Sequence, residues 1–310
     1  MAAIRTILIL TVLTVASIGI GSEGLAAVTC GGERATEVGT AGSDEIEGTQ
    51  GRDVIAGLGG NDVLAGFGGH DIICGGPGAD TLHGNRGSDF LVGGRGGDFM
   101  VPSSGRDRMN GQRGIDFLNY VTSDEGVTVD LATGRTFGDG NDRFASIEGV
   151  FGSSHSDNLL GSRSGDRLIG NEGGDQIFGR AGNDLLQGGA GNDELDGGAG
   201  RKDVASWQGS PRRIVADLAT GTATGDGTDN LVGIEALSGG GRADTLRGDG
   251  RSNGLFGGGG SDELVGGGGA DVLRAGSGND SLDGGPDVDA LNGGPGRDTC
   301  VNGEDDSNCE

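Results

Sequence analysis

The chain has 310 residues, of which 73 are glycine and only 4% are aromatic, and its formal net charge is −25. Binding to nucleic acid or to an anionic membrane surface requires clustered Lys and Arg, so this acidic composition excludes both partners and favours cations. Composition alone would also fit a disordered chain, because large apolar residues are scarce and charge is high. The order of residues along the chain decides against disorder.

The first 27 residues are typical of a secretory signal peptide. Arg5 precedes an apolar run over residues 7–20, and small residues follow it up to Ala27. The run is short for a membrane span, so we expect cleavage near Ala27 rather than a membrane anchor. A lipid anchor on Cys30 is less favoured, because a threonine precedes it where a small residue would be expected. Export predicts a secreted, extracellular protein with no membrane contact after signal removal.

A nine-residue period begins after the signal peptide. An aspartate recurs every nine residues from Asp44 to Asp116, with a glycine two residues before it and an apolar residue two residues after it. Low-complexity sequence does not keep such a register, so the pattern indicates a repeat architecture. We expect this first repeat block to span residues 28–118.

Each nine-residue unit predicts a tight turn followed by a short strand. The glycine-rich half can adopt positive φ, and the Asp-x-apolar-x half forms a strand with one residue facing inward. One unit buries too little to fold alone, so units must stack into a solenoid, with two units per coil and two parallel sheets. Asp62 then lies between Asp44 and Asp80 at one edge, while Asp53 and Asp71 line the other edge.

Two longer units interrupt the register, and they match each other at an offset of 87 residues. Residues 127–150 align with residues 214–237, and each segment begins with the alternating apolar residues of a strand. Each segment also has its own Gly-x-Asp step, at Asp142 and at Asp229. We therefore expect two longer coils of the same solenoid. The predicted divisions are insert coils at 119–156 and 206–243, repeat blocks at 157–205 and 244–300, and a C-terminal cap at 301–310.

The stacked carboxylates require a counter-ion. Like charges would recur at the strand spacing of about 4.8 Å, where their repulsion opposes folding. Calcium accepts roughly six to eight oxygen ligands, and glycine turns leave backbone carbonyls free to supply some of them. No Cys or His occupies the ligand positions, which argues against zinc and copper. The sequence therefore predicts several Ca²⁺ ions between successive turns.

The aspartates of the best-formed repeats are the candidate calcium ligands. They are Asp44, Asp53, Asp62, Asp71, Asp80, Asp89, Asp98, Asp116, Asp175, Asp184, Asp193, Asp262, Asp271, Asp280 and Asp298. The glycine pattern fails near Asp107, Asp157 and Asp166, where solvated turn carboxylates are expected instead. Asn253 lacks a carboxylate and should weaken its site, and an aspartate replaces the usual glycine before Asp289.

The repeat Gly-Gly-x-Gly-x-Asp-x-apolar-x resembles the haemolysin-type, or repeats-in-toxin, calcium-binding nonapeptides of secreted bacterial proteins. The resemblance extends from about Gly39 to Cys300. It implies an all-β fold, a parallel β-roll that is a right-handed calcium-binding solenoid, here with two longer insert coils. It also implies folding that depends on calcium outside the cell. Family members exported by the type I route carry an uncleaved C-terminal signal, whereas this chain has a cleavable-looking N-terminal one.

Four cysteines in an exported chain predict two disulfides, for which three connectivities are possible. A Cys300–Cys309 bridge would close a short loop and cap the end of the solenoid. A Cys30–Cys74 bridge would then pin the N-terminal segment onto the first coils. The alternative is that Cys74 is free.

No catalytic constellation stands out. His70, His83 and His155 are scattered, and acidic pairs are so frequent that their proximity carries no catalytic information. Toxin or protease activity in the resembling family resides in separate domains, which we do not expect in this chain. We expect a monomeric protein that is not an enzyme and has a structural or surface role. The alternatives are an adhesin or matrix protein that binds cell-surface glycans through the insert coils, and a solenoid polysaccharide enzyme.

Overall fold

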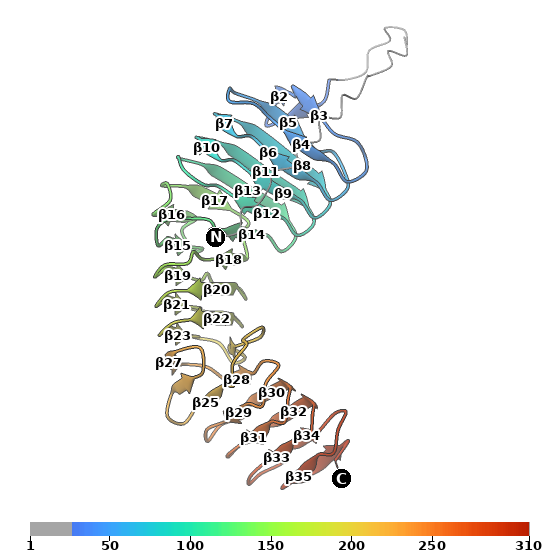
Figure 1. Ribbon diagram of the computed structural model, residues 1–310, viewed down its shortest axis with the longest axis vertical. Coiled ribbons are helices and arrows are strands. Elements are labelled where there is room, and N and C mark those ends of the chain that lie inside the picture. The colour runs from blue at the N-terminus through green and yellow to red at the C-terminus, as the bar shows by residue number, and fades with distance from the viewer. Residues whose placement is uncertain (1–26, 310) are drawn as a thin grey trace, which may run out of the picture.

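The computed structural model describes residues 27–309, which form short strands joined by turns. The strands stack along a curved rod, from β3 (Glu37–Val38) near one end to β35 (Thr299–Val301) at the other (Figure 1). Within this range, no helix is long and apolar enough to cross a membrane. The signal peptide expected over residues 1–27 lies outside the described residues, apart from Ala27.

Two stacks of strands form the long faces of the rod, and we call them sheet 1 and sheet 2. Sheet 1 consists of β4 (Glu45–Glu47), β6 (Val63–Ala65), β9 (Thr81–His83), β12 (Phe99–Val101), β14 (Phe117–Asn119), β18 (Gly149–Phe151), β20 (Arg167–Glu172), β22 (Leu185–Ala190), β24 (Val204–Ser206), β28 (Ala236–Ser238), β30 (Gly254–Gly259), β32 (Val272–Ser277), β34 (Ala290–Asn292) and β36 (Asp305–Ser307).

Sheet 2 forms the opposite face. It consists of β3, β5 (Val54–Ala56), β8 (Ile72–Pro77), β11 (Phe90–Arg95), β13 (Arg108–Arg113), β15 (Thr128–Asp130), β16 (Arg135–Phe137), β17 (Arg143–Ala145), β19 (Asn158–Leu160), β21 (Gln176–Phe178), β23 (Glu194–Asp196), β25 (Val215–Asp217), β26 (Thr222–Thr224), β27 (Thr228–Val232), β29 (Thr245–Arg247), β31 (Glu263–Val265), β33 (Ser281–Asp283) and β35. Two short pairs lie outside both sheets: β1 (Thr29–Cys30) with β2 (Glu33–Arg34), and β7 (Gly68–Gly69) with β10 (Arg86–Gly87).

The strand register confirms two nine-residue units per coil. In sheet 1, Ile46 is paired with Leu64, and in sheet 2, Ile55 is paired with Ile73, so parallel neighbours are 18 residues apart. Successive units alternate between the two sheets. The apolar residue two positions after each repeat aspartate therefore points into the space between the sheets.

The core is a single continuous file of aliphatic side chains between the sheets. Ile55, Leu64, Ile73 and Leu82 are fully buried, and the file continues along the rod to Leu291. Full burial of such a side chain stabilises a fold by about 1.5–3 kcal/mol, and each nine-residue unit contributes only one. The thinness of this core explains why a coil depends on its neighbours.

The inserts differ from the other coils by an antiparallel hairpin in sheet 2. In the first insert, β17 pairs with β13 in parallel, β16 runs antiparallel between β17 and β15, and β15 resumes parallel pairing with β19. The second insert repeats this order with β27, β26 and β25. Sheet 1 stays parallel, because β14 pairs with β18 and β24 pairs with β28. The strands expected from the alternating apolar residues are present as β15 and β25, but the nine-residue pattern did not reveal the hairpins.

Each hairpin lengthens one face of the rod. An added strand widens a sheet by about 4.8 Å, and sheet 1 receives no equivalent addition. The rod curves so that β15, β19, β23 and β27 lie on its outer side (Figure 1). The inserts therefore change the direction of the solenoid without interrupting its core.

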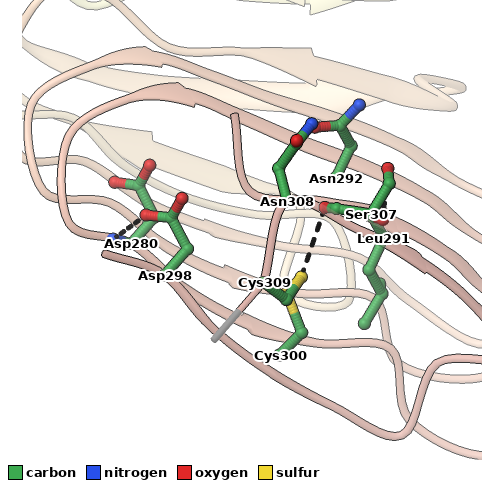
Figure 2. Close-up of a disulfide and its surroundings, with 8 residues drawn as sticks. All are labelled: Asp280, Leu291, Asn292, Asp298, Cys300, Ser307, Asn308 and Cys309. Atoms are coloured by element: carbon green, nitrogen blue, oxygen red, sulfur yellow. Dashed lines mark hydrogen bonds between the residues drawn. A yellow bond between two sulfur atoms is a disulfide. The ribbon is translucent and has the colours of Figure 1, made fainter. Parts of the chain in front are cut away.

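Both predicted disulfides are present. Cys30 is joined to Cys74, with 5.8 Å between their Cα atoms, and the β1–β2 hairpin packs over the outward side chains of Val54 and Ile72 in sheet 2. Cys300 is joined to Cys309 and packs against the end of the core. Figure 2 shows this second bridge beside the last paired aspartates of the solenoid. Each bridge thus closes one end of the rod.

Candidate calcium-binding turns

The repeat aspartates lie at the turns between the two sheets, with their side chains directed inward. Asp62, Asp80 and Asp98 are at most 1% exposed, although carboxylates are normally found at the surface. The glycine two residues earlier has positive φ in many of these turns, as at Gly78, where φ is 151°. Glycine is required there because a side chain would also collide with the carbonyl oxygen of Gly60 in the preceding coil.

Beyond the starting turns, one oxygen of each repeat carboxylate joins successive coils. The N–H of Asp62 donates to Oδ1 of Asp80 over 2.8 Å, and the N–H of Asp80 donates to Oδ1 of Asp98 over 2.9 Å. The same bond recurs along both edges of the rod. Charge-assisted hydrogen bonds of this kind are among the stronger ones in proteins. We call each of these bonded pairs a rung.

Along one edge the rungs continue into the inserts, and along the other edge they end on glutamates. The N–H of Asp107 donates to Oδ1 of Asp142, over 2.9 Å, although the two residues are 35 positions apart. Glu148, Glu235 and Glu304 accept the last N–H of a series through Oε2. These glutamates were not predicted from the nine-residue pattern, although Glu148 and Glu235 stand at matching positions of the 87-residue repeat.

The other oxygen of most repeat carboxylates has no hydrogen-bond donor. A buried carboxylate oxygen without a partner is unfavourable, so these atoms mark places where a cation would be stabilised. The residues with a buried, unpartnered Oδ2 are Asp62, Asp71, Asp80, Asp89, Asp98, Asp107, Asp116, Asp175, Asp184, Asp193, Asp203, Asp262, Asp271, Asp280, Asp289 and Asp298.

A glycine, which has no side chain, lies next to most of the unpartnered oxygens; Pro102 and Ala275 replace it before Asp107 and Asp280. A Cβ on Gly57 would collide with Oδ2 of Asp62 and would lie 2.8 Å from the carbonyl oxygen of Gly75 in the next coil. Among residues 27–309, no group of three or more His, Cys, Asp or Glu side chains is placed to hold a metal. An ion in these turns would therefore take much of its shell from backbone carbonyls, which suits Ca²⁺.

The first coil of each repeat block differs from the coils that follow. Oδ2 of Asp44 accepts hydrogen bonds from the N–H and the hydroxyl of Thr40, and Oδ2 of Asp53 accepts the same pair from Thr49. The same oxygen is bound by a backbone N–H four residues earlier at Asp157, Asp166 and Asp244, and Oδ1 of Asn253 is bound in this way. The starting turns are thus closed by protein donors.

This comparison changes the set of candidate ligands. Asp44 and Asp53 were candidates, but their Oδ2 atoms already have donors. Asp107 and Asp289 were expected to be weak, yet each has a buried, unpartnered Oδ2 like the rest of its series. The turn before Asp289 forms because Asp287 itself adopts a φ of 86°. Asp203, which follows one extra residue, also belongs to the series.

The inserts replace the free oxygen with an internal hydrogen bond. The Tyr120 hydroxyl and the Thr136 hydroxyl donate to Oδ2 of Asp142, over 3.4 and 2.9 Å. At the matching position, the indole N–H of Trp207 donates to Oδ2 of Asp229 over 3.1 Å. Neither aromatic residue was predicted from the nine-residue pattern. The sequence does contain an indication of their shared role, because both aromatic residues stand at the same position of the 87-residue repeat.

Burial raises the pKa of many of these carboxyl groups. Desolvation is the largest cause, and neighbouring carboxylates add to it, bringing the pKa of Asp98 to about 7 and that of Asp107 to about 8. The same causes bring the pKa of Asp175 to about 7. Without a cation, these three carboxyl groups therefore stay protonated up to near-neutral pH, and a divalent ion would release the protons.

These features define a class: a parallel β-solenoid whose glycine turns hold rows of buried carboxylates. The model of the RTX calcium-binding nonapeptide repeat (4 copies) matches more than half of the chain, and the chain belongs to this family. The matched segments are residues 38–73, 65–100, 151–186, 169–201, 238–273 and 265–300. A search of curated proteins finds no match. Calcium binding follows from the family, and the unpartnered oxygens show that the turns fit the ion.

Proposed function

We propose that this protein is an extracellular rod that folds around several calcium ions and serves a structural or surface role. The observation that carries the proposal is the set of sixteen buried aspartates, within residues 27–309, whose Oδ2 atoms lack a donor. These oxygens are hydrated in the unfolded chain, so their burial destabilises the fold unless a cation replaces the lost water. Calcium-binding repeats of this kind are typically non-catalytic, and the proposed role requires no catalysis.

The calcium ligands in this proposal form three arrays. They are the unpartnered aspartates of residues 62–116, 175–203 and 262–298, together with the glycine carbonyls of the same turns. The arrays are separated by the insert rungs at Asp142 and Asp229, which bind aromatic donors instead. Asp44 and Asp53 end the first array with hydrogen bonds from threonine.

The extracellular assignment rests on redox chemistry and calcium supply. Disulfides persist in oxidising compartments, and the structure has two. Calcium is plentiful outside cells, where weak carbonyl-rich sites can still be filled. The signal-like N-terminus expected from the sequence agrees with this location.

A calcium titration followed by circular dichroism and calorimetry tests the proposal. We expect a largely disordered chain in chelator and a β-rich chain in calcium, because repulsion and chain entropy outweigh the thin core without the ion. Magnesium should substitute poorly, since its small octahedral shell is matched badly by loose carbonyl-rich turns. A β-rich spectrum that excess chelator at neutral pH leaves unchanged would contradict the proposal.

A further inference from the structure

A groove lies on the outer face of sheet 2, where the first insert joins the first repeat block. Its volume is about 790 Å³, and it is formed by β13 together with β16 and β17. Four exposed arginines line it, namely Arg106, Arg108, Arg135 and Arg143, and the two buried carboxylates Asp107 and Asp142 lie at its base strands. This concentration of positive charge stands on a protein whose formal net charge is −25.

These arginines have no carboxylate partner. All four are exposed, and none forms an ion pair in the part of the chain that the structure describes. Arg108 lies opposite Arg143 in the sheet, and Arg143 lies opposite Arg135. Like charges directly opposite each other on neighbouring strands destabilise a sheet. The cluster is therefore a cost to the fold that an anionic ligand would remove.

The second insert provides an internal comparison. Its hairpin repeats the same strand pairing, and a corresponding hollow lies against it. Glu194, Asn230 and Thr222 occupy the places of Arg108, Arg143 and Arg135 there. The same backbone is thus built without any of the three arginines. The architecture does not require them, and their presence in the first insert calls for a different reason.

Aromatic side chains complete the groove. Phe137 lines the groove and is 50% exposed, and the guanidinium of Arg108 lies over the ring of Phe90, with 5.8 Å between the guanidinium carbon and the ring centroid. Aromatic rings next to guanidinium groups suit a ligand that has both apolar ring faces and acidic groups. A long polyanion such as nucleic acid would be repelled by the acidic rest of the molecule, whereas a short one would fit.

We propose that this groove binds an anionic oligosaccharide, with its acidic groups paired to Arg108, Arg135 and Arg143 and its sugar rings against Phe137. Arginine recognises carboxylate and sulfate groups through paired N–H donors. The choice of a glycan rests on the proposed extracellular location, and the groove forms only in the chain that calcium has folded. The second insert lacks the three arginines, so we expect no equivalent site there.

Fluorescence polarisation tests the site with the full chain in saturating calcium. The labelled probes are an oligogalacturonate, a sulfated heparin oligosaccharide, a neutral oligosaccharide of equal length and polyglutamate. The groove variant is Arg135→Gln/Arg143→Gln. The control is Arg163→Gln/Arg167→Gln, which removes the same charge from exposed positions outside the groove.

We expect at least one acidic oligosaccharide to bind, and the groove variant to weaken it about tenfold or more, while the control changes affinity about twofold or less. The two acidic probes distinguish carboxylate from sulfate recognition. Equal losses in both variants, no acidic oligosaccharide binding, or preference for polyglutamate would overturn the proposal. A calcium titration of each variant, followed by circular dichroism, distinguishes failure of this proposal from failure of the proposed function. If the groove binds no glycan, folding in calcium is still expected to be seen, with the same calcium midpoint.

Discussion

At the scale of single residues, each carboxylate within the three arrays has two separate tasks. Its Oδ1 accepts the N–H of the preceding coil, and its Oδ2 faces a glycine turn. The two tasks can be separated by mutation, because asparagine keeps an oxygen acceptor and loses the charge. A row of such residues therefore allows the charge to be tested with the hydrogen bond preserved.

Asp71→Asn should raise the calcium midpoint and lower stability in calcium by about 2 kcal/mol, since it removes a charged ligand from the middle of an array. The matched control is Asp53→Asn, because Oδ2 of Asp53 already accepts hydrogen bonds from Thr49. It should change the midpoint much less. Calorimetry and calcium titration measure both variants. If the two variants titrate alike, the unpartnered oxygens are not the calcium ligands.

The insert rung gives a second residue-scale prediction, concerning Asp142. Thr136→Val should lower stability in saturating calcium by about 1–3 kcal/mol, because the hydroxyl donates to Oδ2 over 2.9 Å and also accepts the N–H of Asp142. Tyr120→Phe should have a smaller effect, since its bond is longer, at 3.4 Å. Thermal unfolding compares the two variants. A larger loss for Tyr120→Phe would show that the aromatic donor, not the threonine, satisfies the carboxylate.

At the scale of elements, the nine-residue period was sufficient to predict the coil. It correctly placed Ile55 over Ile73 and the aspartates at two edges, because side-chain direction and turn position repeat with the sequence. The same period did not predict the hairpins of the inserts. β15 and β16 have only three residues each, and their side chains alternate between exposed and buried positions as those of a parallel strand would. The closed first turns could have been recognised from Thr40 and Thr49, four residues before their aspartates.

The closing elements at the two ends should differ in strength. The Cys30–Cys74 bridge spans 44 residues and the Cys300–Cys309 bridge spans 9, so the loop-entropy model gives about 4 and about 2.5 kcal/mol respectively. Replacing both cysteines of a pair by serine, one pair at a time, tests this by thermal unfolding. The N-terminal variant should also expose Val54 and Ile72, which the β1–β2 hairpin covers.

Peptide mapping without reduction checks the pairing itself. We expect one peptide pair containing Cys30 with Cys74 and another containing Cys300 with Cys309. A linked Cys74–Cys300 peptide would contradict the closure of both ends. Equal thermal losses for the two serine variants would instead show that loop length does not set their contributions.

At the scale of the whole molecule, the acidity of the chain sets the conditions under which it can fold. The buried carboxylates of all three arrays share one problem, because folding removes their water before any partner is supplied. Calcium and protons are the two partners that can compensate for this lost hydration. Calcium should compensate by binding the carboxylates at neutral pH, and protons should do so by neutralising them in acid.

The stability of the calcium-free protein should depend on pH. The pKa of Asp98, Asp107 and Asp175 in the fold is raised to about 7, 8 and 7 from the ordinary value of 3.8. Between pH 3.8 and the raised pKa values, the folded chain thus binds more protons than the unfolded chain. The free energy of unfolding of the calcium-free protein therefore falls as pH rises through this interval. The contribution is full below pH 3.8 and lost by about pH 8.

Calcium-free protein should therefore gain β structure when pH is lowered from 8 to 4, and the calcium midpoint should rise over the same interval because protons compete for the ligands. Circular dichroism at fixed ionic strength measures both effects. The Asp53→Asn variant should follow the wild type, whereas replacing Asp98, Asp107 and Asp175 together by asparagine should flatten the pH response. A calcium-free chain equally disordered at pH 4 and pH 8 would show that desolvation of these carboxylates is not what opposes folding.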